Sequence, residues 1–424
     1  MGWRNWREDS NFSTTFYSYS KNFKDNITKR LKYAFARENV VTWKFKLAIL
    51  CITHILLHVY TNTPFTLIPI LMDEYSLTMF QLSLLVSVPR GIQLLLSIPS
   101  GLLADKFSAE KLISLSLFLS AIAGLLLFTS SSIWSLIIGF ALIAASSTIY
   151  HPPALSATSE VIPEDYRSRG MGFHGASGSF GISLGPITIG LVLNSLGWRY
   201  TYVIWTLPIL IVAIITLFLK IDWEKREGRI KEEEKKFTAP LRHVLSLTFI
   251  AFLLFISMRS AAGSSISTFI TTYLTKGRGI DPSIASIIFG LSPLIGLGGP
   301  IIGGWLGDKL GWKRTFIIIF SIMITSLTLL VISPIVLLSV IFYLLYGISS
   351  TMTMPISSTL VALVTPEEAR GTAYSIYFIP TSVAGIIMPI IASLLVDLYG
   401  IWIIFPIAII LYLSALTLIK VIKV

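Results

Sequence analysis

The sequence predicts an all-α integral membrane protein with twelve transmembrane helices in two pseudo-symmetric six-helix bundles. Three observations predict it: 54% of the residues are hydrophobic and only 13% charged, the apolar runs have the length of membrane spans, and the two halves repeat each other. A soluble protein of 424 residues needs more charge to cover its surface. We therefore expect lipid to be the solvent for most of this chain.

Twelve apolar runs are long enough to cross the hydrocarbon core, which takes about 20 residues in a helix. Backbone hydrogen bonds must close within each span, so helices are expected and open sheets are excluded. Very short connections, such as Ser333-Pro334, make neighbouring helices antiparallel. The expected spans are residues 43–71, 79–103, 111–130, 133–158, 169–194, 198–220, 244–274, 283–306, 315–332, 335–359, 371–396 and 400–420.

The positions of Lys and Arg indicate which side of the membrane each loop faces. With the N-terminus inside, 28 of the 33 basic residues fall in inner segments, and the outer loops hold Arg199, Lys276 and Arg278. Because cytoplasmic loops are enriched in Lys and Arg, we expect both termini in the cytoplasm and the protein in the cell membrane. This topology explains the net charge of +11 without a nucleic-acid partner.

The two halves resemble each other at an offset of about 203 residues, which separates Asp105 from Asp308. The segment that joins the two halves is dense in mixed charge, as expected of a solvated linker. Two bundles related in this way place a binding site between them near the membrane midplane. The expected organisation is a cytoplasmic tail over 1–40, a first bundle over 41–220, a linker over 221–240 and a second bundle over 241–424.

One loop motif occurs in both halves, as GLLADK at 101–106 and GWLGDKLGWKR at 304–314. Both copies resemble the signature that follows helices 2 and 8 in the major facilitator superfamily of transporters. The first copy departs from it at Ser108, Ala109 and Glu110, where the signature has Gly and basic residues. The resemblance covers all twelve helices and implies a monomeric transporter that alternates access to a site between its bundles.

The resemblance also implies which residues control gating. In the family the carboxylate of this loop meets the start of helix 11, because a helix N-terminus attracts an anion. Here Asp105 would take that role with Arg370 as its partner, and a helix cap at the membrane edge is the structural alternative. The residues expected to act in gating are Asp105, Lys106, Asp308, Lys309, Arg370, Gly185 and Pro186.

The segment GMGFHGASGSFGISLGPITIG at 170–190 resembles the glycine- and proline-rich helix 5 of this superfamily, a pattern usually linked to antiporters. Small residues let helices approach and slide, although tight packing explains the same pattern. YHPPALS at 150–156 followed by RGMGFHG at 169–175 most resembles the fosmidomycin-resistance and related branches.

Ionisable groups deep inside a span indicate function. Arg90 and Arg259 are expected at mid-depth, and no Asp or Glu lies at a comparable depth in the sequence. Guanidinium groups bind carboxylates through paired hydrogen bonds, so we expect these arginines and the helix 1 residues His54 and His58 to bind an anionic substrate. Structural bracing of the helices is the alternative for each of them.

Histidines raise the questions of proton coupling and metal binding. Either His54 or His58 could carry a coupling proton, because imidazole titrates near neutral pH. The same pair has a spacing that fits zinc, but the sequence supplies neither a third ligand nor a catalytic Glu, so no metal site is expected. His151 and His174 are expected as polar residues in the cytoplasmic half.

These observations predict a carrier, with a small organic anion as substrate. A proton-driven efflux antiporter for drugs or metabolites is the alternative, and an anion exchanger that needs no proton also stays open. An enzyme is not expected, because no cluster of nucleophile and base appears at one depth of the membrane. No cofactor is expected, and the expected partners are a small solute, the lipid bilayer and, in the coupled version, protons.

Overall fold

The computed structural model describes residues 43–219, 221, 246–365 and 370–422. In this part of the chain twelve helices are long and apolar enough to cross a membrane and no strand occurs, which confirms the predicted fold class. The predicted tail and, apart from Ile221, the predicted linker lie outside the described residues.

The helices follow the predicted spans to within a few residues, except that helices 1 and 8 are each interrupted. They are residues 43–58 with α2 (Thr63–Tyr75), α3 (Met79–Lys106), α4 (Ala109–Phe128), α5 (Ile133–Val161), α6 (Arg167–Val192), α7 (Tyr200–Leu217), α9 (Leu247–Thr272), α10 (Pro282–Ile295) with α11 (Gly299–Leu310), α12 (Trp312–Ile332), α13 (Val336–Val364), α14 (Arg370–Tyr399) and α15 (Ile404–Leu418).

Capping residues determine where several helices begin on the side away from the chain termini. The side chain of Thr78 accepts a hydrogen bond from the backbone of Gln81, whose own side chain bonds back to Thr78. Ser132 begins α5 with the same reciprocal arrangement. Asp281 caps α10, which then starts with a proline. Each cap satisfies backbone N–H groups that have no partner inside the helix.

The first membrane span is broken at residues 59–62, between its helical parts at 43–58 and 63–75. Pro64 is the second residue of α2, just after the break, and its missing N–H suits the start of a helix, where that group has no partner inside the helix. The carbonyl of Tyr60, inside the break, accepts from both the backbone N–H and the hydroxyl of Thr63, at 3.3 Å and 2.7 Å. In transporters, interrupted helices of this kind commonly occur at substrate sites.

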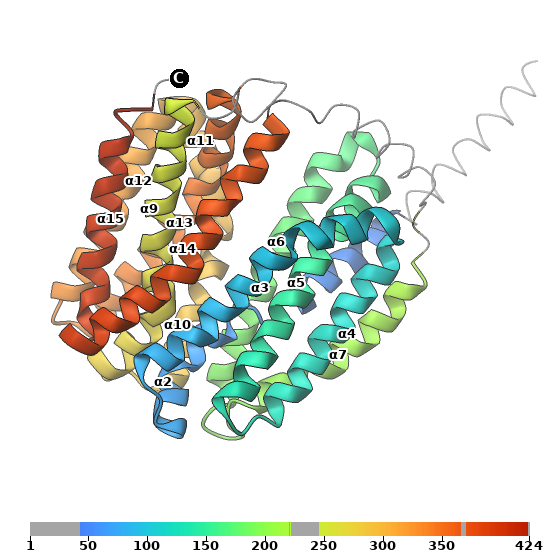
Figure 1. The fold of residues 1–424 in the computed structure, drawn as a ribbon, viewed down its shortest axis with the longest axis horizontal. Coiled ribbons are helices and arrows are strands. Elements are labelled where there is room, and N and C mark those ends of the chain that lie inside the picture. Colours follow the sequence, from blue (N-terminus) through green and yellow to red (C-terminus); the bar gives the residue numbers. More distant parts are fainter. Residues whose placement is uncertain (1–42, 220, 222–245, 366–369, 423–424) are drawn as a thin grey trace, which may run out of the picture.

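The helices pack as two groups that diverge toward the side of the chain termini (Figure 1). In the first group α4 packs against α5 and α7, and α3 packs against α5. In the second group α9 packs against α14 and α15, and α13 packs against α11 and α12. The groups meet where α6 contacts α10, α3 contacts α14, and α2 contacts α9.

Hydrogen bonds between the groups lie in the half of the molecule away from the termini. The hydroxyl of Thr271 donates to the carbonyl oxygen of Phe65 at 2.5 Å. Ser283 donates to the carbonyl oxygen of Gly190. The hydroxyls of Ser393 and Ser83 lie 3.4 Å apart. The two groups are therefore closed together on this side, which we call the closed side.

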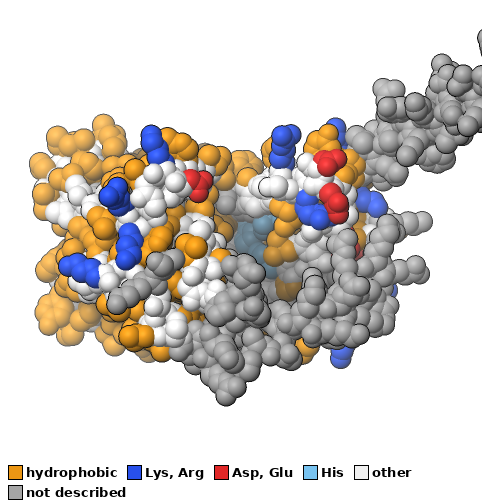
Figure 2. Space-filling model, turned by 90° about the horizontal axis from the view of Figure 1, so that it is seen from above, with side chains coloured by type: hydrophobic (Ala, Val, Ile, Leu, Met, Phe, Trp, Pro, Cys, Tyr) orange, Lys and Arg blue, Asp and Glu red, His pale blue; other side chains and the backbone are white. Residues whose placement is uncertain are grey.

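The opposite face is hollowed between the two groups. Figure 2 views this face from above and shows Lys and Arg side chains around the opening, with histidine visible inside it. Figure 1 shows that α3 and α14, which contact each other, lie close together near the closed side and separate toward this face. The structure is therefore open on the side that carries the termini.

Candidate functional site

Arg90 lies in α3 and lines a pocket of about 40 Å³ between the first, second and fourth spans, with space for a few water molecules or a small anion. Its guanidinium donates to the side-chain oxygen of Gln93 at 3.0 Å. Its aliphatic part faces α14, since a Cβ built on Gly385 would lie 3.6 Å from it. Arg90 thus lies where the two groups of helices meet, and Gln93 is a polar neighbour that the sequence did not single out.

Arg259 lies in α9, on the other side of the hollow. Its guanidinium donates to the hydroxyl of Thr353 in α13 at 3.2 Å, while its buried Nε has no hydrogen-bond partner among the described residues. The hydroxyls of Tyr346 and Tyr412, 2.9 Å apart, lie nearby. Within the described residues no carboxylate forms an ion pair with Arg90 or Arg259. Both arginines therefore keep their charge available for a bound anion.

Four histidines form one cluster inside the first group of helices. His54 and His58 share one face of the first span, with ring centroids 4.8 Å apart. His151 of α5 brings its Nε2 to 3.3 Å from the Nε2 of His58, and His174 of α6 stacks on His54 with centroids 4.2 Å apart. The side chains of His54, His58 and His174 are buried, and that of His151 is half-buried.

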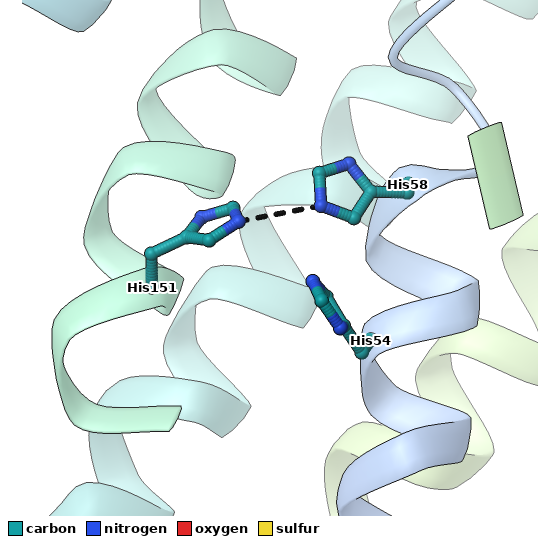
Figure 3. A group of neighbouring side chains, drawn as sticks. All are labelled: His54, His58 and His151. Atoms are coloured by element: carbon teal, nitrogen blue, oxygen red, sulfur yellow. Dashed lines mark hydrogen bonds between the residues drawn. The ribbon is translucent and has the colours of Figure 1, made fainter. Parts of the chain in front are cut away.

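The cluster also provides the third nitrogen ligand that the sequence did not reveal. Ligand atoms of His54, His58 and His151 lie within 4.8 Å of one another, and the three rings point toward a common centre (Figure 3). His151 is 93 residues from His58, so their contact depends on how α5 packs against the first span. Among the described residues, these three form a group that could hold a metal ion.

The glycines of α6 allow this helix to lie directly against the first span. A Cβ on Gly181 would lie 2.2 Å from the carbonyl oxygen of Ile55, and one on Gly185 would lie 1.8 Å from that of Val59. A Cβ on Gly178 would lie 2.5 Å from the ring of His54. Gly185 and Pro186 are both buried, and their expected role in gating stays a prediction.

The charged residues expected to act in gating lie at helix ends on the open side, whereas Gly185 and Pro186 lie inside α6. Asp105 and Lys106 are exposed at the end of α3, and Asp308 and Lys309 are exposed at the end of α11. Arg370 begins α14, but its side chain lies outside what the structure describes. The contact expected between Asp105 and Arg370 therefore stays a prediction.

Comparison with known proteins gives one family. The model of the Major Facilitator Superfamily matches residues 50–378 and 279–423. A fosmidomycin resistance protein of Escherichia coli is 24% identical over 270 residues, which cover 63% of this chain and 66% of that protein. A riboflavin transporter of Clostridioides difficile is 22% identical over 71% of this chain and 76% of that protein.

A solved structure shares the arrangement of the helices. The bacterial homologue of the human lysosomal transporter Spinster, in an inward-facing and occupied conformation, superposes with a TM-score of 0.74. The match covers 89% of this chain and 96% of that one, at 16% sequence identity. At this level of identity the similarity establishes the fold.

Proposed function

Since the chain belongs to the Major Facilitator Superfamily, a family of membrane transporters, we propose that it carries a small organic anion across the membrane by alternating access. The surroundings of the Arg90 side chain are the observation that supports an anion as the substrate. Its guanidinium lines a pocket between the helices, and its partner among the described residues is the neutral side chain of Gln93. A charged group without a counter-ion at this depth favours binding of an opposite charge.

Arg259 supports the same proposal from the second group of helices. Its neighbours Thr353, Tyr346 and Tyr412 offer hydroxyls, which can donate hydrogen bonds to an anion but bring no negative charge of their own. A guanidinium binds a carboxylate through two parallel hydrogen bonds, which fixes the orientation as well as the charge of the ligand. His54 and His58 would complete the polar lining from the first span.

The proposed mechanism is a rocking motion of residues 41–220 against residues 241–424, around a site between them. The hollow on the open side gives the substrate its entry. Access from the other side requires the bonds made by Thr271, Ser283 and Ser393 to break. A single intramolecular hydrogen bond contributes only about 0.5–1.5 kcal/mol, so these contacts are weak enough to exchange during a transport cycle.

We further propose that the open side faces the cytoplasm and that the protein works as a monomer in the cell membrane. The distribution of basic residues in the sequence supports this orientation, because 28 of 33 fall in segments that the sequence assigns to the side of the termini and three in segments that it assigns to the other side. Single cysteines at exposed loop positions, probed with a membrane-impermeant maleimide in intact cells, test the orientation.

A proton-driven efflux antiporter is the second candidate. The glycines at 178, 181 and 185, which pack α6 on the first span, favour it, because this helix 5 pattern is typical of antiporters. The two relatives compared by sequence do not decide between the candidates, since one is a fosmidomycin resistance protein and the other a riboflavin transporter. In this version His54 or His58 would carry the proton.

Transport by purified protein in liposomes tests the proposal. Labelled carboxylates and phosphonates are compared with labelled cationic drugs, each with and without an imposed proton gradient. The proposal expects saturable flux of at least one anion and none of the cations. Flux of cationic drugs alone would reject the anion and favour the antiporter, and the response to the gradient decides whether protons are coupled.

A further inference from the structure

Hydrogen bonds fix the tautomers of two histidines in the cluster. The Nδ1 of His151 lies 2.6 Å from the carbonyl oxygen of Ser147, and the Nδ1 of His54 lies 2.7 Å from the carbonyl oxygen of His174. A carbonyl oxygen can only accept, so both Nδ1 atoms carry the proton in the neutral ring. The Nε2 of each ring is left with a lone pair, as a metal ligand requires.

The third histidine can adopt the same form. The Nε2 of His58 lies 3.3 Å from the Nε2 of His151 and must donate to it when no metal is bound, because that nitrogen of His151 carries no proton. The Nδ1 of His58 lies 3.1 Å from the hydroxyl of Thr61, which can either donate or accept. His58 can therefore move its proton to Nδ1, donate to Thr61, and release Nε2 as a ligand without changing its net charge.

The contacts to Ser147, His174 and Thr61 correspond to those that surround metal-bound histidines. Such a histidine almost always donates its other N–H to a carbonyl, a carboxylate or water, which orients the ring and fixes the tautomer. Here two rings donate to backbone carbonyls and the third has a hydroxyl in reach. All three rings are thus held in place by groups outside the set of ligands.

The spacing of the nitrogens fits a tetrahedral ion. Two nitrogens bound at about 2.0–2.1 Å with a tetrahedral angle lie roughly 3.3–3.4 Å apart. The Nε2 atoms of His58 and His151 already lie at 3.3 Å. The widest separation in the group is within 4.8 Å, and closing it to the tetrahedral value requires a movement of roughly 1.5 Å or less. Gly178 leaves the space in which the ring of His54 lies.

We propose that His54, His58 and His151 bind one divalent transition-metal ion, of the class of Zn²⁺ or Co²⁺, and leave a fourth coordination position open. Neutral imidazoles are preferred ligands of these ions. The three histidines come from the first group of helices only, so a bound ion would not tie the two groups together. This inference goes beyond the proposed function and does not depend on which solute is carried.

The surroundings suggest what fills the fourth position. Thr61 and Ser147, which hydrogen-bond to the rings of His58 and His151, also line the pocket that contains Arg90. A metal ion and the guanidinium of Arg90 would both be cationic and would repel each other, and an anion bound between them would offset both charges. We expect water at the open position, replaced by a small anion where one is present.

Titration of the purified, tag-free protein with Co²⁺ tests the site, because the visible absorption of this ion reports tetrahedral coordination. The expected result is one ion per chain with a tetrahedral spectrum, and displacement by one equivalent of Zn²⁺. His58→Ala and His151→Ala should weaken binding by roughly 100-fold or more, since each removes a ligand. His151→Gln serves as a conservative second variant, and each variant must match wild type in helical content and elution volume.

His174→Phe is the matched control, because phenylalanine keeps a ring stacked on His54 but has no nitrogen. Wild-type affinity in this variant, together with loss in the two ligand variants, supports the site. Absence of the tetrahedral spectrum at millimolar Co²⁺ overturns the proposal. Binding that persists in His58→Ala and His151→Ala, or that is lost equally in His174→Phe, assigns the ion elsewhere and overturns it as well.

Discussion

The ammonium group of Lys276 lies 2.7 Å and 2.5 Å from the two carboxylate oxygens of Asp73. Asp73 ends the first span and Lys276 ends the seventh, so this ion pair joins the two groups of helices across the closed side. Both side chains are partly exposed, at 63% for Asp73 and 42% for Lys276, and solvent therefore screens the attraction. The pair is one of several weak contacts that keep this side shut.

Asp73→Asn should shift the protein toward the conformation that is open on the other side. An exposed ion pair contributes about 0.2–1 kcal/mol, so the ratio of the two conformations should change by up to roughly fivefold. Spin labels at Phe80→Cys and Ile335→Cys, in a Cys51→Ser background, report the distance across the closed side. The charge exchange Asp73→Lys with Lys276→Asp is the control and should restore the wild-type distribution; a distribution unchanged in Asp73→Asn contradicts the gating role.

Gly181→Ala should destabilise the protein, because the new Cβ would lie 2.2 Å from the carbonyl oxygen of Ile55 and force α6 away from the first span. Overpacking of this kind costs about 1–3 kcal/mol. Gly175→Ala on the same helix is the matched control, since a Cβ there meets nothing within 4 Å. The measurement is the midpoint of thermal aggregation in detergent, and equal midpoints for the two variants would show that the close approach is unnecessary.

Thr61→Val should weaken metal binding without removing a ligand. The variant keeps the shape of the side chain but loses the hydroxyl that lies 3.1 Å from the Nδ1 of His58. Loss of a hydrogen-bond partner of a ligand typically lowers metal affinity by about 10- to 100-fold. Thr66→Val, which removes a hydroxyl that donates to the carbonyl of Thr63 in its own helix, is the control. An affinity for Co²⁺ equal to wild type in Thr61→Val would leave His58 without the proposed support.

The twelve spans were predictable because their length and hydropathy are local properties of the sequence. The break at residues 59–62 was less visible, although Pro64 is a signal that could have found it. The contact between His58 and His151 was not predictable, because it joins residues 93 apart through the packing of two helices. In the same way, only the structure shows that Gly178 lies so close to the ring of His54 that a larger residue would not fit there.

The two arginines illustrate the same division. Their place inside the spans and the lack of a neighbouring acid follow from the sequence. Their partners, Gln93 for Arg90 and Thr353 for Arg259, depend on rotamers and on which helix lies opposite. The first partner lies three residues away on the same helix face and could have been inferred from spacing, whereas the second comes from another span.

Anion flux in liposomes, measured for wild type, Arg90→Ala and Arg259→Ala, tests the central claim most directly. A hydrogen bond to a charged group contributes about 1.5–3 kcal/mol, so each variant should lose at least roughly tenfold in transport efficiency. Lys44→Ala, which removes an exposed cation at the start of the first span, should transport as wild type does. Anion flux that survives in both arginine variants would contradict the account and show that the two arginines only stabilise the packing of the helices.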